Sequence, residues 1–382
     1  MWVFLFTFSL FIPINAALIW ICLIPIIIID LWLSFTLGLM FILPIQRKTP
    51  DIPDHLIFEE QDIDGYPVRW LRTPMDNGKP LAILIHGWNS RSLNMEGRSN
   101  IYIDSGYNVL LFEMRAHGGN KPVDHWAAMH VCHDFEKVME LYSDNGWLEN
   151  GFIVHGHSMG GFIAQRGLRV ELETSSNLKG VILESPVTSY SLINNRTCEV
   201  LRIPEVLHPW MMKRLLRHYN SMNDSVYHIK DIEFLESPNW GLPDAPTLLI
   251  QAKFDKTLGQ KHWKHLVDVH SRCDSNFTYH IVEELKHSQE RTNKERDQLM
   301  RDMEQEAEAE GGKVADEYGD KLDGIDKVLA KLNESYKNQE TYAIIDKLNP
   351  YVFKKALEFE LAKLKEINDE IYVATCEKIA KK

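Results

Sequence analysis

Residues 152–161 read FIVHGHSMGG. The first four are typical of a short buried strand, and a helix-prone stretch follows from Gly160 to about residue 172. Between them stands G-x-S-x-G, whose glycines at 156 and 160 leave no Cβ to obstruct a sharp strand-to-helix turn. The turn raises the Ser158 hydroxyl above the sheet, at a helix N-terminus that favours a negatively charged oxygen. We therefore predict that Ser158 is a nucleophile, supported by Gly156 and Gly160.

Short apolar runs recur on both sides of this turn and alternate with helical patterns. The runs occupy residues 81–85, 108–114, 180–183, 247–251 and 278–282, and the helical patterns cover 126–142 and 262–269. Apolar strands separated by helices predict an α/β fold, with a mostly parallel sheet covered by helices on both faces. The stretch from 186 to 242 interrupts this alternation. We interpret it as an insertion over one end of the sheet.

A nucleophilic serine needs a base, and a histidine base needs an orienting carboxylate. Asp255 and His287 each come just after one of the last two apolar runs. They are therefore expected at carboxyl ends of parallel strands, where such sheets place their sites. We predict Ser158, His287 and Asp255 as the catalytic residues, with Glu184 as the rival acid.

The negative oxygen that forms on the substrate needs two backbone donors. One is the N–H of Met159, which follows the nucleophile. The other is expected from the loop after residues 81–85, where Gly87 lets the backbone approach and Trp88 supplies the N–H. His86 is expected to orient this loop and not to exchange protons.

Arg115 and His117 follow the run 108–114 and are expected to brace the loop beside the site. The sequence contains no glycine-rich phosphate loop and no zinc-ligand spacing. We therefore expect neither a cofactor nor a metal ion.

Together these motifs resemble the α/β-hydrolase family, and within it the membrane-anchored serine hydrolases and the monoacylglycerol lipase or lysophospholipase group. The shared stretches are His86-Gly87, residues 115–118, residues 156–161, Asp255 and residues 286–288. The resemblance covers about residues 52–290 and implies the α/β-hydrolase fold, with a cap at about residues 187–240. Two features depart from the family pattern: Ala252 stands where the family often has glycine, and a highly charged segment follows His287 in place of an amphipathic closing helix.

The resemblance implies hydrolysis of a carboxylic ester, of a lipid-like or other acyl substrate, through an acyl-enzyme. Two alternatives stay open: a serine peptidase or thioesterase on the same fold, and an inactive hydrolase body that binds partners through its C-terminal helices. Cap residues such as Trp210, Met211 and Trp240 suit an apolar acyl pocket, or else pack the cap onto the sheet.

Residues 1–46 contain one charged side chain, Asp30, and are expected to bind the protein to a membrane. About 20 apolar residues span a bilayer as a helix. One arrangement is a single span with an interfacial segment; the other, which we favour, is a hairpin turning near residues 20–25. We therefore predict a membrane anchor at residues 1–48. Arg47 and Lys48 directly follow the apolar run, so the positive-inside rule predicts that the catalytic domain faces the cytoplasm.

The whole chain has 382 residues and a formal net charge of −12, with no basic stripe to neutralise phosphates, so a nucleic-acid partner is not expected. We expect the hydrolase domain to occupy residues 49–295 and a charged helical extension to follow at 296–382. Apolar residues recur at three- and four-residue steps from Phe353 to Ile371. This stripe either packs on the hydrolase domain or binds a protein partner.

Overall fold

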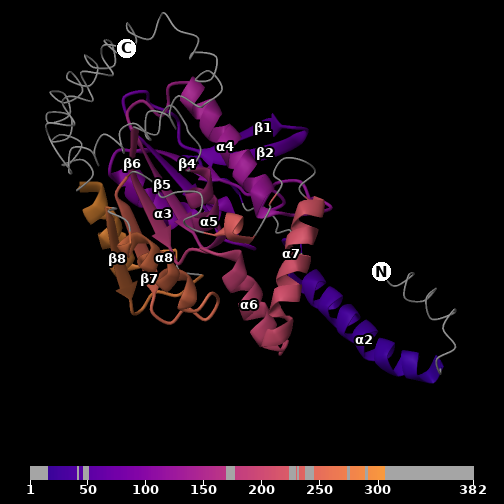
Figure 1. Cartoon of the computed structure of the whole chain (residues 1–382). Coiled ribbons are helices and arrows are strands. Elements are labelled where there is room, and N and C mark those ends of the chain that lie inside the picture. Colours follow the sequence, from indigo (N-terminus) through magenta and orange to yellow (C-terminus); the bar gives the residue numbers. More distant parts are fainter. Residues whose placement is uncertain are drawn as a thin grey trace, which may run out of the picture. The chain divides into compact units, whose positions relative to one another are not determined.

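The computed structural model describes residues 16–40, 43–45, 51–168, 177–222, 229, 232–236, 245–272, 276–288 and 291–305. Within them eight strands form one sheet, in the order β1-β2-β4-β3-β5-β6-β7-β8 (Figure 1). The strands are β1 (Ile57–Ile63), β2 (Tyr66–Arg72), β3 (Leu81–Ile85), β4 (Asn108–Phe112), β5 (Phe152–His157), β6 (Leu178–Glu184), β7 (Thr247–Ala252) and β8 (Phe277–Val282). Only the pairings β1–β2 and β2–β4 are antiparallel, so the mostly parallel sheet expected from the sequence is confirmed.

Helices cover both faces of this sheet, which explains why β3, β4, β5 and β7 are buried at every position. The helices of the folded body are η1 (Ser92–Met95), α3 (Glu96–Asp104), α4 (Ala128–Asp144), α5 (Met159–Gly167), α6 (Tyr190–Val200), η3 (Glu205–Leu207), α7 (His208–Met222), η4 (Ile232–Leu235) and α8 (Lys261–Ser271). Alternate residues of β3 enter two separate cores. Ile83 packs in the core that contains α4 and α5, whereas Leu84 packs in the core that contains α3.

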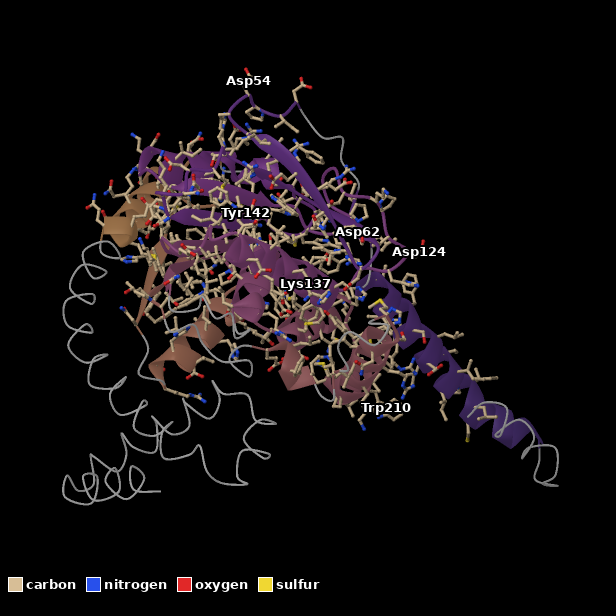
Figure 2. The ribbon with its side chains drawn as sticks, turned by 90° about the horizontal axis from the view of Figure 1, so that it is seen from above. Asp54, Asp62, Asp124, Lys137, Tyr142 and Trp210 are labelled. Carbon is tan, nitrogen blue, oxygen red and sulfur yellow. The ribbon has the colours of Figure 1, made fainter. Side chains whose placement is uncertain are left out.

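The described part of the expected cap consists of α6, η3, α7 and η4, which lie in sequence between β6 and β7. Met211 and Leu215 of α7 are buried, whereas Trp210 is 55% exposed and lies at the outer edge of these helices (Figure 2). Trp240 lies outside the described residues.

The apolar head contains one continuous helix, α2 (Ala16–Met40), which passes through Pro25. The hairpin turn that we expected near residues 20–25 is therefore wrong. An interior proline removes one N–H and crowds the carbonyl four residues before it, but helices of apolar sequence tolerate this change, and α2 continues through Pro25. Asp30 does not force a break either, because its carboxylate pairs with Arg214 of α7. Residues 1–15 and Arg47 and Lys48 lie outside the described residues.

The first compact unit of the chain extends to Met303, and not to residue 295 as we expected. Residues 294–305 are helical, and Met300 and Met303 are buried in the core of the α3 face. Met303 lies against Gly180 of β6, where a Cβ would meet the Met303 Cε at 2.5 Å. The charged segment after His287 thus supplies a helix that closes this face of the sheet. The apolar stripe from 353 to 371 lies outside the described residues.

Candidate active site

Ser158 stands at the turn between β5 and α5 in a backbone conformation that non-glycine residues rarely adopt. Its φ is 54° and its ψ is −116°. The Ser158 N–H donates to the Glu184 carbonyl of β6, and the Ser158 carbonyl accepts from Gly161 and Val187. These three bonds hold the strained turn in place, and a strained serine at a strand-to-helix turn is the geometry of a nucleophile elbow.

The elbow is so tight that only glycine fits around the serine. A Cβ at Gly160 would lie 2.1 Å from the Ile85 carbonyl oxygen, and one at Gly156 would lie 2.5 Å from the Gly160 carbonyl oxygen. A Cβ at Gly87 would approach the Ser158 Cβ to 3.0 Å. The loop after β3 therefore approaches the serine closely, as expected for a loop that helps to bind the substrate oxygen.

His287 and Asp255 lie beside Ser158, although 129 residues separate His287 from the serine in sequence. The Ser158 Oγ is 2.9 Å from the His287 Nε2, and the His287 Nδ1 is 2.7 Å from the Asp255 Oδ2. All three side chains are largely buried. Asp255 follows β7 and His287 follows β8, so both come from the carboxyl ends of parallel strands.

The Asp255 carboxylate is held by several donors. Its Oδ1 accepts the N–H groups of Thr257 and Leu258, at 2.8 and 2.9 Å, and its Oδ2 accepts the Gln251 side chain at 3.3 Å. Burial raises the pKa of Asp255, but the hydrogen bond and charge of His287 and the backbone donors outweigh burial, so its pKa is lowered overall. The carboxylate is therefore ionised and able to hold the His287 Nδ1–H.

The rival acid, Glu184, has a different set of partners. Its carboxylate pairs with the buried Arg98 guanidinium, at 2.6 Å to Nε, and Arg296 lies 3.7 Å away. Burial raises the pKa of Glu184, but Arg98 outweighs burial and holds the pKa well below its ordinary value. The structure brings Asp255, and not Glu184, to the His287 ring.

The two predicted oxyanion donors, the N–H groups of Met159 and Trp88, take part in none of the hydrogen bonds among the described residues. The Trp88 ring packs against His117 and Trp126, with ring centroids 5.2 and 4.4 Å away. His117 also accepts the Asn89 N–H at 3.2 Å. The ring contacts of Trp88 and the hydrogen bond of the next residue, Asn89, together hold the backbone at Trp88 in place.

His86 and Arg115 make contacts that hold loops in place. The Met114 N–H donates to the His86 Nε2 at 3.1 Å, and the His86 Nδ1 lies 2.8 Å from the Gly87 carbonyl oxygen. Arg115 donates two hydrogen bonds to Asp134 of α4, at 2.9 and 2.6 Å. These contacts join the loops after β3 and β4 to neighbouring parts of the fold, and the loop-bracing roles stay predictions.

One contact of the site escaped the sequence analysis. The His157 Nε2 lies 2.5 Å from the His287 carbonyl oxygen. Burial lowers the pKa of His157 to about 3, so its ring is neutral, and a carbonyl oxygen can only accept. The proton of His157 is therefore on Nε2, and His157 ties the elbow to the His287 loop. Nothing in the motif G-x-S-x-G indicates such a role for its second residue.

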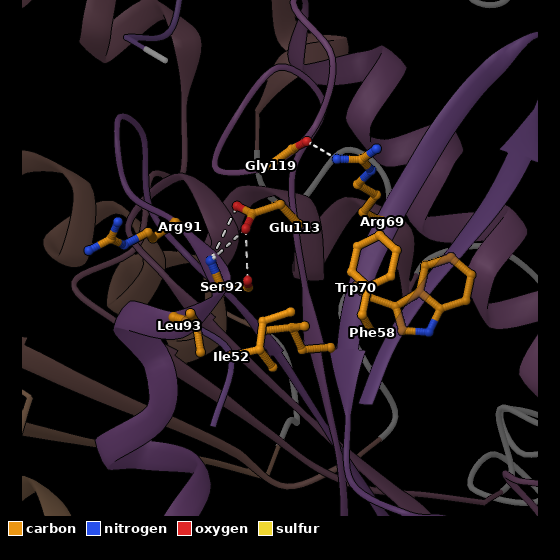
Figure 3. A pocket seen from close by; sticks show the side chains of 10 residues that line it. Ile52, Phe58, Arg69, Trp70, Arg91, Ser92, Leu93, Glu113 and Gly119 are labelled. Atoms are coloured by element: carbon orange, nitrogen blue, oxygen red, sulfur yellow. Dashed lines mark hydrogen bonds between the residues drawn. The ribbon is translucent and has the colours of Figure 1, made fainter. Parts of the chain in front are cut away.

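Two hollows among the described residues are lined by residues other than Ser158, Asp255 and His287. A cavity of about 30 Å³ lies among ten residues that include Arg69, Leu93 and Glu113, where Glu113 accepts hydrogen bonds from Ser92 (Figure 3). A more open hollow of about 330 Å³ is lined by residues that include Glu59 and Tyr142. Neither contains Ser158. Among the residues that the structure describes, no group of three or more His, Cys, Asp or Glu is arranged to hold a metal ion.

Comparison with known proteins finds one family model that is similar to the segment around the Ser158 turn. Residues 77–239 match the family model of serine aminopeptidase, S33; this segment includes Ser158 and ends before Asp255. No curated protein matches the chain. Among solved structures, an esterase of Pyrococcus furiosus is similar, with 19% identity and a TM-score of 0.49 over 69% of this chain and 96% of that one. An α/β hydrolase of a Penicillium species has 13% identity and a TM-score of 0.46, over 66% of this chain and 97% of that one.

The order and direction of the strands are the basis for assigning the fold. Two antiparallel pairings lead into parallel strands, and the serine turn follows β5 near the middle of the sheet. This arrangement is that of the α/β-hydrolase fold, and residues 77–239 are similar to the matched family.

Proposed function

We propose that the protein is a serine hydrolase that cleaves carboxylic esters, with Ser158 as nucleophile, His287 as base and Asp255 as orienting acid. The observation that carries this proposal is the chain of contacts from the Ser158 Oγ to the His287 Nε2, at 2.9 Å, and from the His287 Nδ1 to Asp255, at 2.7 Å. A base within this distance can take the proton of the hydroxyl as it attacks.

The reaction proceeds in two halves. The Ser158 Oγ attacks the acyl carbonyl carbon while its proton passes to the His287 Nε2, and the N–H groups of Met159 and Trp88 bind the oxygen that becomes negative. His287 then gives its proton to the leaving alcohol, which leaves an acyl-enzyme. Water attacks this ester with His287 again as base, and the acid and free Ser158 are released.

The test of the nucleophile is covalent labelling with a fluorophosphonate. We expect the wild-type protein to be labelled and Ser158→Ala to remain unlabelled, because the probe reacts only with an activated serine. Absence of labelling of the folded wild-type protein would reject the enzyme and favour a scaffold that binds partners through its C-terminal helices. Labelling that persists in Ser158→Ala would instead assign the reaction to another residue.

The substrate is proposed to be a lipid-like ester, and the chain to be tethered to a membrane by α2. Residues 21–39 have a mean hydropathy of 2.2, and only 11% of them are buried in the structure. A tether of this kind keeps the site near amphiphilic substrates. An ester panel of graded acyl length checks this: rates that rise with acyl length support a lipid substrate, and rates highest for acetyl esters contradict it.

The family match favours one further candidate activity. The matched family is that of a serine aminopeptidase, and the same nucleophile could cleave an amide or a thioester. Aminoacyl anilides and acyl thioesters compared with the matching esters decide between these activities. A higher kcat/KM for the anilides would replace the esterase by a peptidase.

The proposed orientation places the folded body in the cytoplasm. It rests on Arg47 and Lys48, the first basic residues after the apolar head. Protease added outside intact cells should leave the body uncut, whereas digestion there would reverse the topology.

A further inference from the structure

The cap helix α7 and the apolar helix α2 are joined by an ion pair with a small apolar interface around it. Arg214 of α7 pairs with Asp30 of α2 and also donates to the Ser34 hydroxyl, at 2.9 Å. Beside this pair, Leu33 of α2 packs with Met211 and Cys198 of the cap, and Leu33 and Met211 are fully buried. The second half of α2 is therefore fixed to the cap.

The same half of α2 is apolar on its opposite face, and that face is not covered. Leu31, Phe35 and Leu39 follow one another at four-residue steps, about 180° around the helix from the buried face, and are 64%, 67% and 39% exposed. A helix that is apolar all round belongs in a core or a membrane. Since the cap covers only one face of α2, the opposite face of α2 needs an apolar environment outside the folded body.

The exposed face of α7 beside this interface has the composition of a membrane surface contact. Trp210 is 55% exposed, and the basic residues Lys213 and Arg217 follow on the same face of α7. Val206 of η3, just before α7, is 80% exposed. Helix α7 contains no acidic residue, although the chain has a net charge of −12. Tryptophan beside basic residues is typical of the headgroup level, where rings and cations both find partners. Exposed acidic residues nearby are Glu199 and Glu205.

We propose that this surface, which comprises Val206 of η3, the outer face of α7 (Trp210, Lys213 and Arg217) and the outer stripe of α2 (Leu31, Phe35 and Leu39), lies on the headgroups of an anionic bilayer. The proposal rests on the membrane tether of the proposed function. The proposed contact fixes how deeply α2 enters the bilayer. The Asp30–Arg214 pair lies at the membrane surface, and residues that precede Asp30 cross the hydrocarbon region. The sequence has 29 uncharged residues there, more than the roughly 20 that a span requires.

This depth explains the single charge of the apolar head. A carboxylate inside hydrocarbon is costly, whereas one at headgroup level, paired with Arg214 and next to Ser34, is not. The second half of α2 then leaves the bilayer obliquely, with its inner face on the cap and its outer stripe at the boundary of headgroups and acyl chains. In Figures 1 and 2 the first half of α2 extends beyond the cap helices, as such a path requires.

The experiment measures the depth of single nitroxide labels on the full chain in vesicles of phosphatidylcholine mixed with phosphatidylglycerol. Cys22, Cys273 and Cys376 are first changed to Ser, which leaves the buried Cys132 and Cys198. Labels are then placed at Val206→Cys, at Ile24→Cys, and at Asn145→Cys on the exposed end of α4 as the matched control. A cooperative unfolding transition of each variant verifies its fold.

We expect a water-soluble nickel chelate to lose access to positions 206 and 24 but to reach position 145, with position 24 about 9 Å deeper than residue 30. Arg214→Asp should restore access to position 206, and the exchange Asp30→Arg with Arg214→Asp should remove it again. Vesicles of phosphatidylcholine alone should weaken the protection of position 206, since its basic neighbours then lack anionic partners.

Two results overturn the proposal and are distinguishable from each other. Protection at position 24 with full access at position 206 leaves the tether intact and rejects the cap contact. Full access at position 24 rejects the tether itself, and with it the membrane part of the proposed function.

Discussion

At the scale of single residues, the site depends on a backbone that is strained at Ser158 and on neighbours without a Cβ. The serine has a φ of 54°, and the loop with Gly87 lies against it. Strain of this kind persists only where the surroundings determine it, here through hydrogen bonds to the ends of β6 and α5. Single substitutions in the site should therefore distinguish what the charge of Asp255 contributes to activity from what the close packing at Gly160 contributes to stability.

Asp255→Asn should lower kcat for ester hydrolysis by about 10⁴-fold, because an amide no longer holds His287 in the tautomer that accepts the Ser158 proton. The fold should survive, since the carbonyl oxygen of Asn can still accept the N–H groups of Thr257 and Leu258. Steady-state kinetics with a soluble ester measure the effect. Asp268→Asn, at an exposed ion pair on α8, is the matched control and should stay near wild type. A loss of less than tenfold in Asp255→Asn would exclude Asp255 as the acid.

Gly160→Ala should destabilise the folded body by about 3 kcal/mol or more, because its Cβ would lie 2.1 Å from the Ile85 carbonyl oxygen and the backbone must move. Gly78→Ala is the control, since the nearest atom to its Cβ, the Asp76 Oδ1, is 3.5 Å away. Urea denaturation compares the two variants. Equal stabilities would show that the elbow is looser than the structure indicates.

At the scale of elements, buried charges join the carboxyl end of β6 to the helices on one face of the sheet. Glu184 of β6 pairs with Arg98 of α3, and Arg296 of the helical residues 294–305 approaches the same carboxylate. Breaking a buried pair is more harmful than never having one, because the remaining charge stays buried. This contact therefore helps to hold the closing helix, which the sequence analysis did not foresee.

Arg98→Met should reduce the free energy of unfolding by about 3–5 kcal/mol, because it leaves the Glu184 carboxylate without its closest partner. Arg272→Met breaks the exposed pair with Asp268 on α8 and should cost less than about 1 kcal/mol. Chemical denaturation of both variants measures the difference. A loss in Arg98→Met as small as that of the control would mean that Arg296 replaces Arg98 fully.

At the scale of the whole molecule, several histidines are buried as neutral rings. Burial lowers the pKa of His117 and His157 to about 3 and that of His262 to about 4. In the unfolded chain these rings take up protons near pH 6.5. The folded state binds fewer protons below that pH, so stability falls as the pH decreases.

The free energy of unfolding should therefore be constant above about pH 7 and decline from pH 6.5 to 4.5, by up to roughly 1.4 kcal/mol per pH unit for each of these rings. Urea denaturation at several pH values measures the slope. His262→Gln removes one titrating ring, so unfolding should take up about one proton fewer, and the slope of the free energy of unfolding against pH should fall accordingly. A stability that rises toward pH 5 would contradict the sign of these pKa shifts.

The order of amino acids is enough to predict the parallel sheet, the serine turn and the ends of β7 and β8, where Asp255 and His287 lie. These features follow from local patterns: apolar runs of strand length, and glycines where a Cβ cannot fit. Only the tertiary structure decided which carboxylate reaches His287, what His157 holds, and that Asp30 meets Arg214, 184 residues away. Such contacts depend on distances between residues far apart in the chain, and no local pattern encodes them.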